Sequence, residues 1–167
     1  MTQTALPSSD ITTDSWTTAP LFSKVNDSSD LTYITGPAGA TTQCEVALAA
    51  VTDPVGNTLH TINVRALAVG SQAGEKLTWY LYEGSTLQAT SAATTVDRSS
   101  ITNYSYTLSA AEADALTAYT DLRIRLAQTT IGTGETINVY ECFFTCPDAA
   151  ASWTPVDPMG ASGFFGV

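Results

Sequence analysis

The side chains best suited to proton transfer, nucleophilic attack and zinc binding are scarce in this sequence, which has one histidine, His60, and three cysteines. A catalytic histidine needs a nucleophile and an orienting acid beside it. The sequence contains no G-x-S-x-G, H-E-x-x-H, Walker A or G-x-G-x-x-G pattern. We therefore expect His60 to be a structural or surface residue.

Carboxylates could support calcium binding or glycoside hydrolysis. Residues 26–30 read Asn-Asp-Ser-Ser-Asp, an oxygen-rich loop without the glycine and terminal glutamate of an EF-hand, so a solvated turn is the favoured interpretation. Hydrolysis of glycosides needs two carboxylates that face each other across a cleft. Glu45, Glu75, Glu83 and Glu141 lie on or beside expected strands, and no neighbouring residue marks one as a general acid. We predict no enzymatic activity, no metal site and no cofactor.

The cysteines are Cys44, Cys142 and Cys146, an odd number that argues against a full disulfide framework. On one strand, Cys142 and Cys146 would lie about 13 Å apart, which is too far for a disulfide. A second pair of metal ligands is also missing near them. The sequence therefore predicts reduced, semi-buried thiols in a protein that is made in a cytoplasm.

Charge and length exclude several classes of partner. The chain has 167 residues and a formal net charge of −10, from 16 acidic and 6 basic side chains. Such a surface is repelled by phosphate backbones and by anionic lipids, so we expect neither nucleic acid nor membrane as a partner. No apolar run approaches the roughly 20 residues of a membrane span. The N-terminus lacks the basic and apolar regions of a secretory signal.

Alternating apolar residues and turn signals predict about eight strands. The expected strands are 31–35, 42–50, 59–69, 77–83, 86–96, 101–108, 122–128 and 136–145. Short strands at this spacing, with one evident helix, favour an antiparallel β-sandwich that resembles a jelly roll over a βαβ fold. The predicted fold class is therefore all-β.

The one helix signal begins at Ser109. Ser109 and Glu112 have the spacing of a capping box, and the alanine-rich residues that follow favour a helix over 109–119. After Asp121 the apolar period falls to two, with Leu122 on one face and Arg123 on the other. The sequence thus predicts a short crossover helix that leads into a strand.

The domain organisation that we predict has an N-terminal arm at 1–29, a β-sandwich domain at 30–146 and a C-terminal arm at 147–167. The arms are rich in polar residues and proline but carry large aromatic side chains. These side chains, which we expect to bind a partner, are Trp16, Trp153, Phe164 and Phe165. For Trp16, packing on the protein's own domain and packing on a neighbouring subunit both remain open.

Two groups of strand residues have alternative interpretations. Seven tyrosines, together with Trp79, could form a face that stacks on sugars, or could pack inside the sandwich. Arg123 and Arg125 stand on one strand face in an acid-rich chain. We expect them to pair with acids on neighbouring strands, and a contact with an acidic partner is the alternative.

Several segments together resemble a known class of proteins. They are Trp16 followed by Leu31-Thr-Tyr-Ile34, Asp53-Pro54 before the strand with Arg65, Leu81-Tyr-Glu-Gly84, and Tyr106-Thr-Leu-Ser-Ala-Ala-Glu112 leading into Tyr119-Thr-Asp-Leu-Arg-Ile-Arg125. Over about residues 15–147 this pattern resembles the small accessory structural proteins of tailed bacteriophage virions, of the head decoration or cement type.

The resemblance implies a non-enzymatic capsid decoration protein that bridges capsomers through its arms. Its partners would be the major capsid protein or other virion proteins, with a homo-oligomer as a further possibility. It would be made in the host cytoplasm and located on the capsid surface of the virion. The alternatives are a glycan- or receptor-binding β-sandwich module, and a phage tail or head-tail completion protein.

Overall fold

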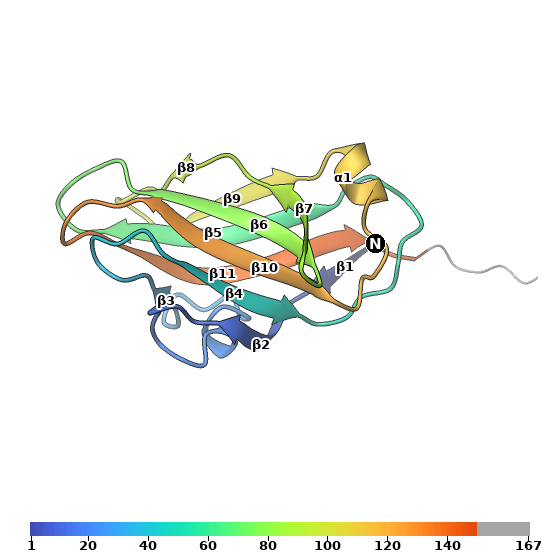
Figure 1. The fold of residues 1–167 in the computed structure, drawn as a ribbon, viewed down its shortest axis with the longest axis horizontal. Coiled ribbons are helices and arrows are strands. Elements are labelled where there is room, and N and C mark those ends of the chain that lie inside the picture. Colours follow the sequence, from blue (N-terminus) through green and yellow to red (C-terminus); the bar gives the residue numbers. More distant parts are fainter. Residues whose placement is uncertain (150–167) are drawn as a thin grey trace, which may run out of the picture.

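The computed structural model describes residues 1–149 and consists of two antiparallel β-sheets packed face to face (Figure 1). The strands are β1 (Thr2–Ala5), β2 (Pro7–Thr12), β3 (Ile34–Thr35), β4 (Gln43–Leu48), β5 (Thr61–Val69), β6 (Lys76–Glu83), β7 (Thr86–Thr90), β8 (Thr94–Thr95), β9 (Thr102–Thr107), β10 (Leu122–Thr130) and β11 (Thr136–Pro147). A 3-10 turn, η1 (Phe22–Lys24), and a short helix, α1 (Ala110–Asp114), complete the described elements. The predicted all-β sandwich is confirmed.

The strand order follows a jelly roll. The first sheet has the order β1-β11-β5-β9 with β3 also paired to β11, and the second has the order β2-β4-β10-β6-β7 with β8 also paired to β6. When β1, β2 and β8 are set aside, eight strands remain. Numbered again in chain order, β3, β11, β5 and β9 are the first, eighth, third and sixth of these eight strands and form one sheet. β4, β10, β6 and β7 are the second, seventh, fourth and fifth, and they form the other sheet, which is the strand order of a jelly roll.

The inward faces of both sheets carry the apolar residues that the period-two pattern predicts. Ile62 and Val64 of β5 are almost completely buried, and so are Leu77 and Leu81 of β6. In β11 the pairing with β5 shifts between Val139 and Glu141, at a bulge. Burial of each such leucine or isoleucine stabilises the fold by about 1.5–3 kcal/mol.

The prediction of an extended N-terminal arm is wrong. β1 pairs with β11 in the first sheet, and β2 pairs with β4 in the second, so the chain crosses between the sheets at Leu6. Further along, Trp16, Leu21 and Val25 are buried in the core. The segment folds in because these apolar residues gain burial. Its two short strands also satisfy backbone groups along the sheet edges.

The short helix is confirmed at its start but ends earlier than predicted. The Ser109 hydroxyl accepts the Glu112 amide, and the Glu112 carboxylate accepts the Ser109 amide, so the capping box forms. The helix stops at Asp114 rather than continuing to 119. The Glu83 carboxylate accepts both the amide and the hydroxyl of Thr117, which gives that backbone a partner outside a helix.

One end of the sandwich gathers α1, the N-terminus, the 49–60 connection and the last residues of β11 (right in Figure 1). The Gln3 side chain holds these parts together. Its amide group donates to the carbonyl oxygens of Thr52 and Pro147, and its oxygen accepts the Thr52 amide. We call this region the α1 end.

Candidate functional site

His60 is a structural residue, which is one of the two alternatives that the sequence predicted; the other was a surface residue. Its ring is fully buried, with Nδ1 2.9 Å from the Thr58 carbonyl oxygen and Nε2 2.7 Å from the Tyr119 hydroxyl. Because a carbonyl only accepts, Nδ1 carries the proton and Nε2 accepts from Tyr119. Burial lowers the pKa of His60 and raises the pKa of Tyr119 to about 12. Both ring nitrogens are therefore occupied in a neutral, buried pair.

The four strand glutamates do not assemble into a catalytic pair. Glu45 lies on β4 of the second sheet, where Arg125 and Arg123 neutralise it. Glu83 caps Thr117, Glu75 is buried just before β6, and Glu141 lies on β11 of the first sheet. The predicted cross-strand pairing of both arginines with acids is confirmed.

The 26–30 loop uses its carboxylates internally. Asp27 accepts the Ser29 amide and the Thr32 hydroxyl, and Asp30 forms an ion pair with Arg65. Among residues 1–149, no group of three His, Cys, Asp or Glu side chains is arranged to hold a metal ion. The loop therefore docks on the first sheet.

All three cysteines are free thiols and are completely buried, more deeply than the semi-buried positions that we predicted. Burial raises the pKa of Cys142 to about 12 and that of Cys146 to about 11. A thiol needs to ionise before it can attack or bind a metal. These cysteines are therefore inert core residues at neutral pH.

Of the four aromatic residues that were predicted to bind a partner, the structure describes Trp16 alone. Its side chain is 3% exposed and belongs to the core, so the alternative of packing on its own domain holds and Trp16 is removed from the candidate interface. Trp153, Phe164 and Phe165 lie outside the described residues.

The tyrosines do not share one face. Tyr104 and Tyr106 of β9 pack against the core, where the Tyr106 hydroxyl donates to Glu112. Tyr80 and Tyr82 lie on β6 of the second sheet, and the Arg125 guanidinium sits 4.2 Å from the Tyr82 ring centre. Tyr119 is buried beside His60, and Tyr33 and Tyr140 form a separate pair with ring centres 5.2 Å apart, in which Tyr140 is buried. A continuous tyrosine platform for sugars is therefore absent from the described part of the chain.

The α1 end exposes apolar side chains on an unusual backbone. Val55 is 86% exposed and Leu59 is 66% exposed, and both have positive φ angles, of 60° and 59°. For side chains of these kinds the left-handed conformation costs on the order of 1–3 kcal/mol each, and such residues cluster at functional sites. Val55 also borders a hollow of about 230 Å³, whose other lining residues are Asp53, Gly56, Ala113, Asp114, Leu116 and Tyr119.

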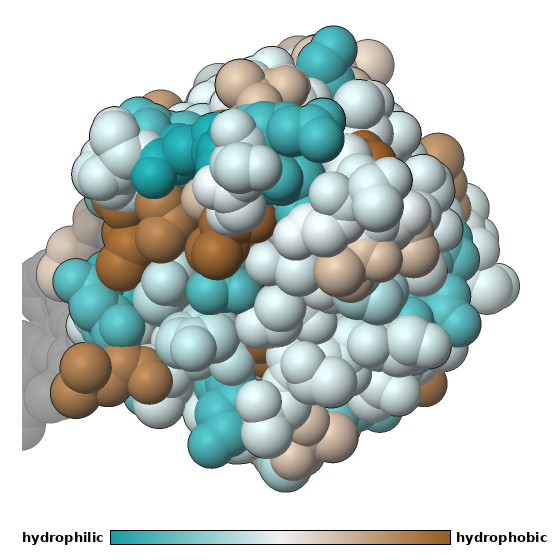
Figure 2. Space-filling model, turned by 90° about the vertical axis from the view of Figure 1, so that its left-hand side faces the viewer, coloured by the Kyte–Doolittle hydropathy of each residue, from teal (hydrophilic) through white to brown (hydrophobic). Residues whose placement is uncertain are grey.

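The opposite end of the sandwich also exposes apolar side chains, among them Val69 at the end of β5, which is 41% exposed. Figure 2 looks onto it, and polar or neutral residues (teal and white) cover most of that surface, with brown apolar residues in small groups. The sequence alone did not mark the α1 end, because its apolar residues are isolated within a polar loop. The one local signal was the turn pattern Asp53-Pro-Val-Gly-Asn57, which contains Val55.

No family model matches the chain, and no curated protein matches its sequence. None of the helices within residues 1–149 combines the length and the apolar character needed to cross a membrane.

Proposed function

We propose that the protein is a non-enzymatic structural protein of a virion, a capsid decoration or cement protein that attaches through its α1 end. The observation that carries the proposal is the pair of exposed apolar residues Val55 and Leu59, held in costly backbone conformations at the end where the described chain stops. The major capsid protein is the proposed partner. A homo-oligomer around a capsid symmetry axis is compatible with this attachment.

The exposure of Val55 and Leu59 fits contact with a partner better than a role in the fold. Neither Val55 nor Leu59 stabilises the core, and each is strained. Burying one such side chain against a partner is favourable by about 1.5–3 kcal/mol. Repeated over many copies on one shell, contacts of this modest strength give a firmly decorated particle.

The proposed segment for further contact is the C-terminal one, with Trp153, Phe164 and Phe165. It follows β11, which ends at Pro147 in the α1 end, so the chain continues from the proposed interface. Deleting residues 159–167 is expected to abolish attachment without lowering the melting temperature of the domain. Equal loss of both would contradict this role of the segment.

The acidic charge supports a position outside the nucleic-acid compartment. A net charge of −10 repels a packaged phosphate backbone and favours a basic protein surface. The outer capsid surface is the proposed location. A tail or head-tail completion role remains the rival candidate, and copy number separates the two, because decoration requires hundreds of copies per particle and completion requires a handful.

The decisive experiment is cryo-microscopy of the source particles combined with protein quantification. The proposal expects this protein at many equivalent capsid sites, with Val55 and Leu59 at the contact. Absence from purified particles would overturn it.

A reconstitution assay then tests the α1 end. The Val55→Asn/Leu59→Asn variant removes the apolar contact but suits the backbone, because asparagine tolerates positive φ. We expect unchanged or higher thermal stability and at least tenfold weaker binding to particles that lack the protein. The matched control is Val69→Asn, at a 41% exposed valine on the far end of β5, which should bind normally. Equal binding by both variants would exclude the α1 end.

A further inference from the structure

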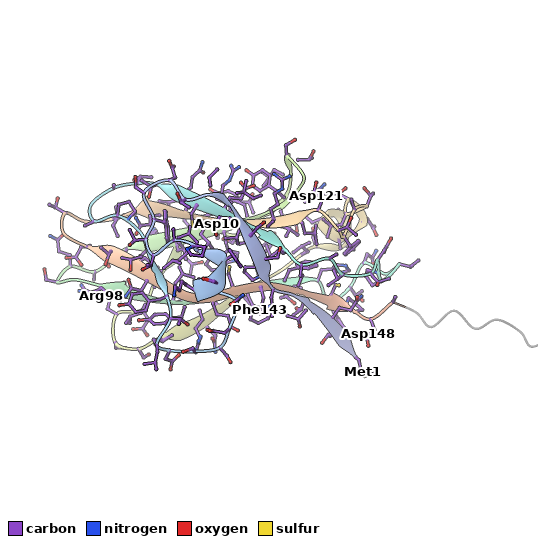
Figure 3. All side chains as sticks on the ribbon, turned by 90° about the horizontal axis from the view of Figure 1, so that it is seen from below. Met1, Asp10, Arg98, Asp121, Phe143 and Asp148 are labelled. Carbon is purple, nitrogen blue, oxygen red and sulfur yellow. The ribbon has the colours of Figure 1, made fainter. Side chains whose placement is uncertain are left out.

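The outer face of the first sheet carries a second candidate site, unrelated to the α1 end. In the register of β11, β5 and β9, Phe143, Asn63 and Ser105 form one row across the strands. Glu141, Arg65 and Asn103 form the next row. Figure 3 marks Phe143 along β11. Since strands lie about 4.8 Å apart, each row spans about 10 Å, comparable to a sugar ring with its hydroxyl groups.

These two rows line a hollow of about 330 Å³, at the small end of the range for ligand sites, which is about 300–1,000 Å³. The inward residues of the same strands fill the core, so the hollow lies on the solvent side. Phe143 and Asn63 are half-buried, and Asn103 and Ser105 are exposed. An aromatic ring and three small polar side chains thus face one shallow site.

The polar side chains of the hollow keep their hydrogen-bonding capacity. Within residues 1–149, the hydrogen bonds nearby run from Arg65 to the 26–30 loop and from Thr145 to Thr61. None involves the side chain of Asn63, Asn103 or Ser105. Each asparagine side-chain amide offers two hydrogen-bond donors and an acceptor, and the serine hydroxyl can also donate and accept. Such groups match ligand hydroxyls, which also donate and accept.

Charge at the hollow excludes ionic ligands. Arg65 is the cation there, and it is already engaged by Asp30, by Glu141 at 3.6 Å and by the Ser29 carbonyl at 3.0 Å. An incoming anion would meet two carboxylates and no free cation. An incoming cation would compete with Arg65 for those carboxylates.

We propose that this hollow binds a neutral saccharide, with Phe143 stacking on the apolar face of a sugar ring and Asn63, Asn103 and Ser105 bonding its hydroxyls. Aromatic side chains supply a large apolar surface for such a contact. Backbone groups of β5 are paired on both sides, so addition of a peptide strand in the middle of this face is excluded. The inference goes beyond the proposed virion role and does not depend on it.

Nuclear magnetic resonance titration of the full chain tests the proposal. The probes are neutral gluco-, manno-, galacto- and xylo-oligosaccharides, with sialylated and sulfated oligosaccharides as charged comparisons. At least one neutral probe is expected to shift the side-chain amide signals of Asn63 and Asn103, with a Kd of about 1 mM or lower. The charged probes are expected to bind more weakly.

Variants identify the residues. Phe143→Ala should weaken binding at least tenfold, and Asn103→Ala, at an exposed position that tolerates change, should weaken it about fivefold, as for one lost hydrogen bond. Gln88→Ala is the matched control, an amide on β7 at the edge of the other sheet, and should retain full affinity.

Three results would overturn the proposal. They are no signal shift from any neutral probe at about 10 mM, tighter binding of a charged probe, and binding that Asn103→Ala leaves unchanged in a folded protein. Because the assay uses the isolated chain, its failure leaves particle attachment untouched, and absence from virions leaves saccharide binding untouched.

Discussion

Glu45 and Arg125 face each other across β4 and β10, with Nε and Nη2 of the arginine 2.8 and 2.6 Å from Oε2 of the glutamate. The glutamate side chain is 5% exposed, whereas the arginine is 28% exposed. Arg125 also donates to the Tyr82 hydroxyl, so three strands of the second sheet meet at this guanidinium. The pair makes an acidic side chain tolerable at a buried position on the sheet.

Replacing Arg125 by alanine is expected to lower the free energy of unfolding by about 2–3 kcal/mol, because Glu45 then stays buried with Arg123 alone, 3.7 Å away. Urea denaturation at pH 7 measures the loss. The double variant Glu45→Ala/Arg125→Ala should lose less than the sum of the two single variants. Strict additivity would show that the pair is energetically independent.

His60 makes the fold sensitive to mild acid. Its pKa is lowered by burial in the folded state and is about 6.5 in the unfolded chain, so the unfolded state binds more protons below that value. Stability should therefore fall as the pH drops from about 6.5 toward 5. The pKa values of Glu83, Glu112 and Glu135 are lowered, so their protonation removes stability only at pH below about 4.5.

The His60→Gln variant isolates this contribution. Glu141, whose pKa is raised by burial, changes stability in the opposite direction near pH 5, and it does so in both proteins. Denaturant titrations at pH 7.5 and 5.5 should give a smaller difference in unfolding free energy for the variant than for the parent. An equal difference would show that the pKa of His60 does not differ between the folded and unfolded states in this pH range.

The capping box gives a local test of the helix. Ser109→Ala removes the hydroxyl that accepts the Glu112 amide and is expected to cost about 1 kcal/mol. Ser85→Ala, in the exposed turn between β6 and β7, serves as the control and should stay within about 0.5 kcal/mol of the parent. Thermal melts of both variants give the comparison. A loss at Ser109 no larger than at Ser85 would mean that the capping hydrogen bond contributes nothing to stability.

Strands with a strong alternating pattern were predictable from the sequence, because one residue in two meets the core. The buried runs from Ile62 in β5, from Leu77 in β6 and from Leu122 in β10 follow this rule. β1 and β2 were missed because edge strands are held largely by backbone pairing, which leaves a weak side-chain signal. The true extent of α1 was missed because Glu83, far away in the sequence, captures Thr117.

The candidate sites were harder to predict than the strands. Phe143, Asn63 and Ser105 become neighbours only through the register of three strands that are far apart in the sequence. A one-residue shift of that register would turn each of them inward. Likewise, Val55 comes to line one hollow with Ala113 and Asp114 of α1, which are far away in the sequence. Both sites depend on long-range geometry that local patterns do not encode.

Trp16 separates an interior role from an interface role. With the side chain 3% exposed in the core beside the N-terminal strands, Trp16→Ala should lower the free energy of unfolding by about 3–5 kcal/mol. Trp16→Phe should recover most of that loss, because the phenylalanine ring refills the cavity. If Trp16 were instead needed to bind a partner, phenylalanine packed inside the domain would not restore binding. Denaturation of the purified variants checks this. Unchanged stability in Trp16→Ala, together with lost particle attachment, would return Trp16 to the interface and contradict its burial.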